Sequence, residues 1–205
     1  MPIRAVVFDF GGVLVRTTDL TLHRAWETRL GLPAGRLPGE VWANPVSEYA
    51  TTGRATPDEV WRYLGDRFGL NDDDLLALQR DFFAHEALDA DLVAFLRGLR
   101  PSYRTAILSN AWPNAREEFT GRFGLGDAVD QIIISAEEGI AKPDICIYSL
   151  TAARLGVHLN EMLFVDDFAP NVTGARAAGM QAILFATPAQ ALAEAHAILA
   201  GSSEL

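Results

Sequence analysis

The sequence predicts an α/β fold, a doubly wound parallel sheet into which a helical subdomain is inserted. Two observations support this class. Short apolar runs rich in β-branched or aromatic residues alternate with segments of helical length in the second half of the chain. A long segment after the first run has several helix-start signals and no comparable run. We therefore expect residues 1–15 and 87–205 to form the α/β core and residues 16–86 to form the insertion.

The apolar runs are typical of strands buried on both faces, because polar and apolar residues do not alternate in them. In chain order they are Ile3–Phe8, Thr105–Leu108, Gln131–Ile134, Met162–Val165 and Gln181–Phe185. Helices are expected between them at Asn114–Phe123, Asp144–Leu155 and Pro170–Ala178. This order predicts parallel β-α-β units.

The insertion shows clear helix-start signals. Thr56 is followed by Pro57 and by Glu59, which is the pattern of an N-cap, a first helical proline and a capping box. Asn71 precedes three aspartates that suit the positive end of a helix. Aromatic residues can supply the insertion with a small core of its own, namely Trp26, Trp42, Trp61, Tyr63, Phe68, Phe82 and Phe83.

Composition limits the class of protein. The 205 residues suffice for one well-buried core. The net charge of −10 disfavours binding to nucleic acids or to anionic membrane surfaces, and no apolar run is long enough to span a bilayer. The single cysteine, Cys146, cannot form an internal disulfide, and its apolar surroundings predict a small buried hydrophobe. These features suit a cytoplasmic protein, either a monomer or a homodimer.

Polar residues follow the predicted strands, where ligands bind in open α/β sheets. We expect them to meet at one edge of the sheet. In chain order they are Asp9, Gly11 and Gly12, then Ser109 and Asn110, then Lys142, and finally Asp166 and Asp167. One such aspartate alone is most often a helix cap, but a set of three carboxylates would repel one another without a cation. Hard oxygen ligands of this kind predict Mg²⁺.

Lys142 gives an independent indication of chemistry. The chain contains sixteen arginines and only this one lysine. A compact ammonium group cannot be replaced by a planar guanidinium where a point charge must bridge a carboxylate and a phosphate. The retention of this lysine therefore favours a role at the same site.

These residues, in this order, resemble the haloacid dehalogenase superfamily over essentially the whole chain. The first motif is similar to Phe8–Leu14, the second to Leu108–Asn110, and the third to Ala141–Asp144 with Ile147 and Tyr148. The fourth is similar to Phe164–Asp167 with Asn171, Gly174 and Ala175. The insertion is similar to the helical cap that follows the first motif in this superfamily and shapes the substrate pocket.

The resemblance implies a magnesium-dependent phosphatase that acts on a small phosphorylated metabolite. Asp9 would attack phosphorus to form an aspartyl-phosphate, Ser109 would bind a phosphoryl oxygen, and Lys142 would neutralise charge on both. Gly11, Gly12 and Asn110 would help to bind the phosphate. Magnesium would be held by Asp9, the carbonyl of Gly11, Asp166 and Asp167, with Asn171 supporting these ligands.

The sequence departs from the usual phosphatase pattern at Gly11. Phosphatases of the superfamily usually carry there a second aspartate, which acts as general acid and base. Glycine cannot transfer a proton, and loss of a placed acid typically costs about 10² to 10⁴ in rate. The sequence is thus similar to the Asp-x-Gly subgroup, which includes bacterial sugar-phosphate phosphatases and the phosphatase domain of some epoxide hydrolases. A sugar phosphate is the favoured substrate.

Two alternatives remain open at this point. One is a binding or regulatory protein of the same fold with weak catalysis, which the glycine at position 11 makes conceivable. The other is a 2-haloacid dehalogenase, which attacks carbon and needs no magnesium. The pair Asp166 and Asp167 counts against the dehalogenase, because that branch lacks paired carboxylates in the fourth motif.

Overall fold

The computed structural model describes residues 2–202 and has a parallel five-stranded sheet at its centre. The strands lie in the order β5-β4-β1-β6-β7, and all four neighbouring pairs are parallel. Their bounds are β1 (Ala5–Phe8), β4 (Arg104–Ser109), β5 (Gln131–Ile134), β6 (Met162–Asp166) and β7 (Gln181–Leu184). All five predicted strands are therefore present, within two residues at each end, and the predicted fold class is confirmed.

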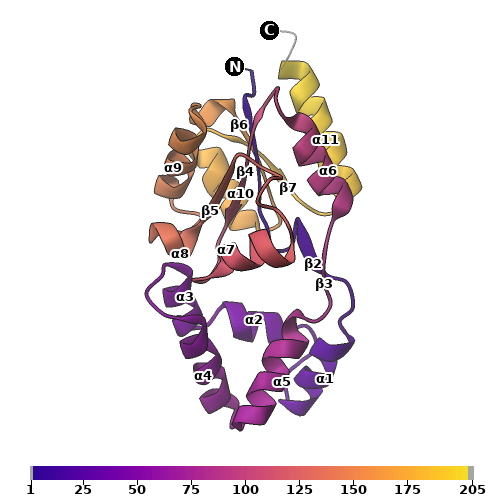
Figure 1. Cartoon of the computed structure of the whole chain (residues 1–205), viewed down its shortest axis with the longest axis vertical. Helices are drawn as coiled ribbons and strands as arrows, with labels where there is room; N and C mark the ends of the chain where they lie inside the picture. The colour runs from indigo at the N-terminus through magenta and orange to yellow at the C-terminus, as the bar shows by residue number, and fades with distance from the viewer. Residues whose placement is uncertain (1, 203–205) are drawn as a thin grey trace.

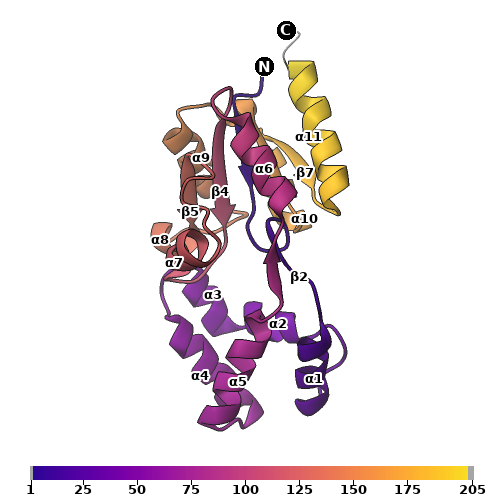
Figure 2. The same cartoon turned by 45° about the vertical axis from the view of Figure 1, so that its right-hand side comes forward.

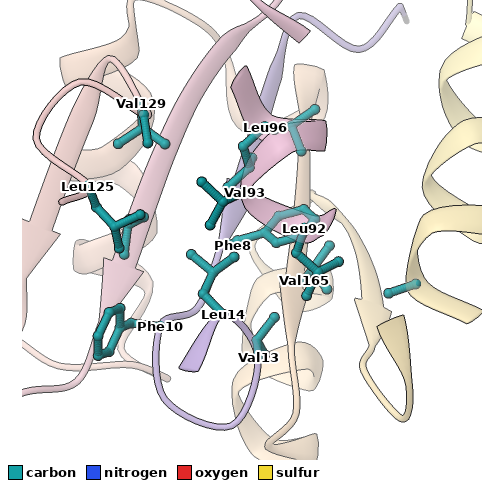
Figure 3. Packing of buried hydrophobic residues seen from close by; sticks show 14 of the residues in the cluster. Phe8, Phe10, Val13, Leu14, Leu92, Val93, Leu96, Leu125, Val129 and Val165 are labelled. Carbon is teal, nitrogen blue, oxygen red and sulfur yellow. The ribbon is translucent and has the colours of Figure 1, made fainter. Parts of the chain in front are cut away.

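Helices cover both faces of the sheet (Figure 1). The side chains of β1 alternate between the two faces, so Val6 and Phe8 join one hydrophobic cluster and Ala5 and Val7 the other. The first cluster is closed by α6 (Ala90–Leu99) and α11 (Pro188–Ser202). Figure 3 shows Leu92, Val93 and Leu96 of α6 packed beside Phe8 and Val165. The second is closed by α9 (Ile145–Leu155) and α10 (Ala169–Ala177).

The connection after β4 differs from the single helix predicted at Asn114–Phe123. It contains a short helix α7 (Ala115–Glu117) and then a π-helical turn η1 (Glu118–Arg122), in which the Phe123 amide donates to the Glu118 carbonyl at 3.1 Å. Gly121 lies inside this segment and weakens a regular helix. The wider turn accompanies the stacking of Phe119 on Phe10, with ring centroids 3.7 Å apart. Two further short helices are α8 (Ser135–Glu138) and η2 (Leu159–Glu161).

Five helices form the insertion, which lies at one end of the core (Figure 1). They are α1 (Thr21–Arg29), α2 (Leu37–Trp42), α3 (Pro45–Thr51), α4 (Pro57–Phe68) and α5 (Asp72–Phe83). The predicted starts are confirmed, since Thr56 and Glu59 form a capping box and Asn71 caps α5. Trp26, Trp61 and Phe82 are buried as predicted. Trp42 is instead 44% exposed.

A two-stranded antiparallel ribbon joins the helical insertion, called the cap below, to the core (Figure 2). It consists of β2 (Val15–Thr17) and β3 (Glu86–Leu88). Arg16, within β2, pairs with Asp89, just after β3, at 2.6 Å. The sequence predicts no strand here, because three residues are too few to show a periodicity and the partner lies some seventy positions away. The predicted boundaries at residues 15/16 and 86/87 fall within this ribbon.

Two other features of the described chain bear on the predictions. Cys146 is exposed at the start of α9, so its predicted burial is wrong. The reason is its position in the first helical turn, outside the face of α9 that packs on the sheet. Within residues 2–202, no helix has the length and apolar character that a membrane crossing requires.

Candidate active site

The parallel sheet brings the ends of β1 and β6 together. These two strands are neighbours in register, with Phe8 opposite Val165, and the Asp9 amide donates to the Val165 carbonyl at 2.8 Å. Asp9 and Asp166 therefore leave the same edge side by side. Oxygen atoms of Asp9, Asp166 and Asp167 all lie within 4.8 Å of one another, in the arrangement of a possible cation site. Strand order thus explains why residues more than 150 positions apart form one cluster.

Lys142 lies between two of these carboxylates. Its ammonium group contacts Asp9 Oδ1 at 2.9 Å and Asp166 Oδ2 at 2.7 Å, and it donates to the Leu108 carbonyl at 2.9 Å. Its side chain is fully buried. All three ammonium protons therefore have acceptors. The single lysine of the chain is held as a buried point charge at the site, as the sequence predicts.

Charge in the cluster is only partly balanced. With three ionised carboxylates and one ammonium, the group would carry a net charge of about −2. Burial raises the pKa of Asp9 to about 7; Lys142 opposes this rise and Asp166 adds to it. Burial, and then the charge of Asp166, also raises the pKa of Asp167. Both shifts reflect the cost of crowding carboxylates together, which a divalent cation would offset.

The residues present fit a magnesium ion. Asp9 receives hydrogen bonds from Phe10 N (2.7 Å) and from Lys142 on Oδ1, so its Oδ2 is available to bind an ion. Asp167 is exposed and close to Asp9. The donors are carboxylate oxygens, the type of ligand that Mg²⁺ prefers. Bound there, magnesium would supply positive charge that draws phosphoryl oxygens to the site and stabilises charge during transfer.

Asp166 is engaged more fully by the protein than the other two aspartates. It is fully buried, and besides Lys142 it accepts from Phe168 N at 2.8 Å and from Asn171 Nδ2 at 3.0 and 3.2 Å. Asn171 is in turn held by Tyr148, whose hydroxyl donates to its carbonyl at 2.8 Å. Asn171 Oδ1 is buried without a hydrogen-bond partner in the described structure. Asp166 thus primarily orients Lys142 and Asn171.

The loop after β1 passes very close to Asp167. Gly12 has φ of +78°, and a Cβ built there would lie 2.1 Å from Asp167 Oδ2. A Cβ at Gly11 would meet nothing within 4 Å. The structure therefore explains Gly12 by the space that Asp167 occupies, and it leaves room beside Gly11 for a larger residue.

The residues after β4 lie at the same edge. Ser109 is the last residue of β4, the strand next to β1, and it is 4% exposed. Asn110 uses its side chain to hold Lys142: its Nδ2 donates to the Lys142 carbonyl and its Oδ1 accepts from the Lys142 amide, both at 2.8 Å. The sequence assigns Asn110 to phosphate binding, and the structure gives its side chain this supporting contact.

Two residues outside the predicted set need comment. Trp112, three positions after Ser109, is buried among cap residues, and no sequence signal separated this contact from ordinary packing. Arg54, in the insertion, lies over the Tyr49 ring at 4.8 Å and beside a hollow of the surface.

Known proteins with similar sequences include several enzymes. A sesquiterpene phosphatase from Aspergillus oryzae is 28% identical over 178 residues, which cover 86% of this chain and 87% of that protein. A D-ribitol-5-phosphate phosphatase from Bacteroides thetaiotaomicron is 29% identical, with 83% and 85% covered. An (S)-2-haloacid dehalogenase from Pseudomonas sp. is also 29% identical, with 89% and 84% covered. The chain spans about a third of a drimenol cyclase from Aspergillus calidoustus, which is 28% identical.

The fold has close counterparts among solved structures. A HAD family enzyme from Bacteroides thetaiotaomicron, crystallised with magnesium and inorganic phosphate, matches with a TM-score of 0.73, covering 91% of this chain and 96% of that one. Its identity of 18% supports the fold alone. The sequence model of haloacid dehalogenase-like hydrolases matches residues 3–179. This match spans well over half of the chain, and the proteins similar to it include phosphatases. The protein belongs to the family of haloacid dehalogenase-like hydrolases.

Proposed function

We propose that the protein is a magnesium-dependent phosphatase that hydrolyses a small phosphorylated metabolite through an aspartyl-phosphate on Asp9. The observation that carries this proposal is the buried Lys142 ammonium between Asp9 and Asp166, with Asp167 beside them. A carboxylate can approach a phosphate only where positive charge offsets their repulsion. The cluster has one buried cation and a set of oxygen ligands suited to a second.

Each residue has a step that its contacts suit. Phe10 N and Lys142 hold Asp9 Oδ1, so Oδ2 is the oxygen that attacks phosphorus. A bond forms between this oxygen and phosphorus as the bond to the leaving oxygen breaks. Lys142 offsets charge on the carboxylate and the phosphoryl group, and Ser109 binds a phosphoryl oxygen. Water then attacks phosphorus, which releases phosphate and restores the Asp9 carboxylate.

The leaving group decides which substrates are suitable, because Gly11 offers no acid to protonate it. We rank first the explanation that the substrates have good leaving groups, such as sugar 1-phosphates or acyl phosphates. The second explanation is that the leaving group takes its proton from water, from the substrate or from the cap. A D-ribitol-5-phosphate phosphatase and a sesquiterpene phosphatase are among the relatives, which supports a small organic phosphate as the substrate. A sugar phosphate is the class to screen first.

Dehalogenation is the second candidate, because a haloacid dehalogenase is among the relatives. It needs an aspartate that attacks carbon, and Asp9 could serve. It does not need the acidic pair, however, whereas here Asp166 accepts one hydrogen bond from Lys142, one from Phe168 N and two from Asn171. These hydrogen bonds hold an acidic pair that only phosphoryl transfer requires, and they therefore favour phosphoryl transfer.

The proposal is tested by phosphate release from an aryl phosphate, whose leaving group needs little protonation. We expect turnover that requires magnesium and disappears in Asp9→Asn. Turnover that continues without magnesium, or in the variant, would count against the mechanism. Halide release from a 2-chlorocarboxylate without magnesium would favour the dehalogenase. No turnover of either compound would favour a binding role.

A further inference from the structure

The hydrophobic core of the cap includes one side chain from the α/β core. Trp112 follows β4 but is buried, 7% exposed, in a cluster whose other buried members all belong to the cap. Those members are Trp26, Leu37, Val41, Ala50, Val60, Trp61, Leu64, Leu78 and Phe82. The ring of Trp112 lies 4.5 Å from that of Trp42 and 6.1 Å from that of Trp61. The two parts of the molecule are thus joined by packing as well as by the ribbon of β2 and β3.

A buried hydrogen bond fixes this contact. The Trp112 indole N–H donates to the Ser47 hydroxyl at 3.0 Å, and Ser47, on α3, is fully buried. The Ser47 amide donates in turn to Asn44 Oδ1, the N-cap of α3, at 2.9 Å. A buried indole N–H that lost its acceptor would be costly, so the bond specifies how α3 sits against the core.

The segment that carries Trp112 also holds the groups assigned to phosphate. Asn110 makes both of its side-chain hydrogen bonds to the backbone of Lys142. The next residue, Ala111, donates its amide to Ser135 Oγ at 3.1 Å. Ser109, the predicted phosphoryl ligand, begins this segment. Residues 109–112 therefore form a continuous connection from the cap to Lys142.

A second close approach lies beside the first. A Cβ at Gly53, just after α3, would lie 2.4 Å from the Ala136 carbonyl, next to the Ser135 that holds Ala111. Both views place α3 against α8 on the side of the cap that faces the core (Figures 1 and 2). Helix α3 thus contacts Trp112 itself and also helix α8, whose Ser135 accepts the Ala111 amide.

We propose that Trp112 is a positioning residue that couples the cap to the phosphate-binding segment 109–112. Any displacement of α3 then moves the segment that carries Ser109 and orients Lys142. The cap consequently affects how tightly the phosphoryl group is bound, as well as the binding of the leaving group. The part of this inference that concerns phosphate rests on the proposed phosphatase function, whereas the coupling itself does not.

The coupling is tested without turnover by amide hydrogen exchange. The Ala111 N–H, which donates to Ser135, and the Lys142 N–H, which donates to Asn110, serve as reporters of this segment. We expect Ser47→Ala, a change within the cap, to speed their exchange by at least about tenfold, the effect of losing roughly one hydrogen bond. Leu78→Val, in the same cluster but on α5 rather than on α3, should leave both reporters unchanged. Equal effects of the two variants, or none, would overturn the coupling.

Phosphate affinity tests the functional consequence. In Trp112→Phe and in Ser47→Ala we expect inhibition by inorganic phosphate to weaken by about tenfold, with magnesium affinity unchanged, because no magnesium ligand is touched. The double variant should be no worse than either single one, as expected for residues that act as a pair. Additive losses, a parallel loss of magnesium affinity, or unchanged inhibition would overturn the role of Trp112. Wild-type protein that neither binds phosphate nor turns over aryl phosphate would instead contradict the proposed function, and the exchange result would still decide the coupling.

Discussion

Asp167 occupies the space in which any residue larger than glycine at position 12 would place its Cβ. Gly12 also has a positive φ, so substitution there adds backbone strain to the steric contact. The two effects can be separated, because Gly69 has a similar φ of +64° but open space around it.

We predict that Gly12→Ala lowers magnesium affinity by at least about tenfold, as displacement of a metal-site carboxylate typically does. Gly69→Ala should cost about 1–2 kcal/mol of folding free energy from the strain alone and leave magnesium affinity unchanged. Calorimetric titration with magnesium measures the first effect and urea unfolding the second. Wild-type affinity in Gly12→Ala would show that the position of Asp167 does not matter for the ion.

Lys142 shows what residue-scale reasoning from sequence can do. Its scarcity predicts a role at the site, and the structure places it between two carboxylates of that site. The hydrogen bonds that hold it could not be predicted. They come from Asn110 and Leu108, some thirty positions away, and such pairings depend on loop geometry that no local pattern encodes.

At the scale of elements, the strands were predictable because each is a short, mostly apolar run. Strands β1, β4, β5 and β6 are largely buried as expected, whereas in β7, at the edge of the sheet, only Ile183 is buried. The ribbon of β2 and β3 and the π-helical turn η1 were not, since both depend on contacts with distant segments. The starts of α4 and α5 followed local rules of capping, whereas α1 and α2 have no side-chain cap. The packing of α1 against the start of α2 depends instead on a single buried carboxylate.

That carboxylate is Glu27, which is 3% exposed and accepts the Leu37 amide at 2.9 Å. Burial raises its pKa, but hydrogen bonds from the backbone amides of Leu37, Gly35 and Arg36 outweigh this effect and lower the pKa overall. Because the folded pKa lies below the unfolded value of about 4.3, the ionised group stabilises the fold above that pH. The contribution is lost as the pH falls through the folded pKa.

We predict that Glu27→Gln costs about 1–2 kcal/mol of unfolding free energy at pH 7, the difference between charged and neutral hydrogen bonds. The cost should shrink as the pH is lowered below about 4, where Glu27 in the wild type also becomes neutral. Urea unfolding at pH 7 and pH 3.5 measures it, with the exposed Glu117→Gln as a control that changes little. A cost that is the same at both values of pH would contradict the role of the charge.

At the scale of the whole molecule, sequence order alone predicts that the strand ends meet, because the chain connectivity of a doubly wound sheet places them at one edge. It does not predict how the cap is seated. Trp112 could not be distinguished from an ordinary core residue, since its partners lie on α3 and α2, far away in sequence. The cluster of three carboxylates forms only in the folded protein, so an ion bound there stabilises the whole fold.

We predict that magnesium stabilises the folded protein, because an ion that binds only the folded state at 100 times its Kd adds about 2.7 kcal/mol. For a chain of this size, that corresponds to a rise in Tm of roughly 5–10 °C. Asp167→Asn should abolish most of the rise, while sodium chloride of equal ionic strength should not reproduce it. An equal rise in the variant would place the ion elsewhere.

The covalent intermediate tests the central claim most directly. Wild-type protein is mixed with magnesium and an aryl phosphate and quenched in acid within the first turnover. It is then digested, and the mass of the peptide that contains Asp9 is measured by mass spectrometry. We predict a phosphoryl group on Asp9 that hydroxylamine removes and that does not form in Asp9→Asn. Phosphate release with an unmodified Asp9 peptide throughout the turnover, or with the phosphoryl group on another residue, would contradict Asp9 as the nucleophile.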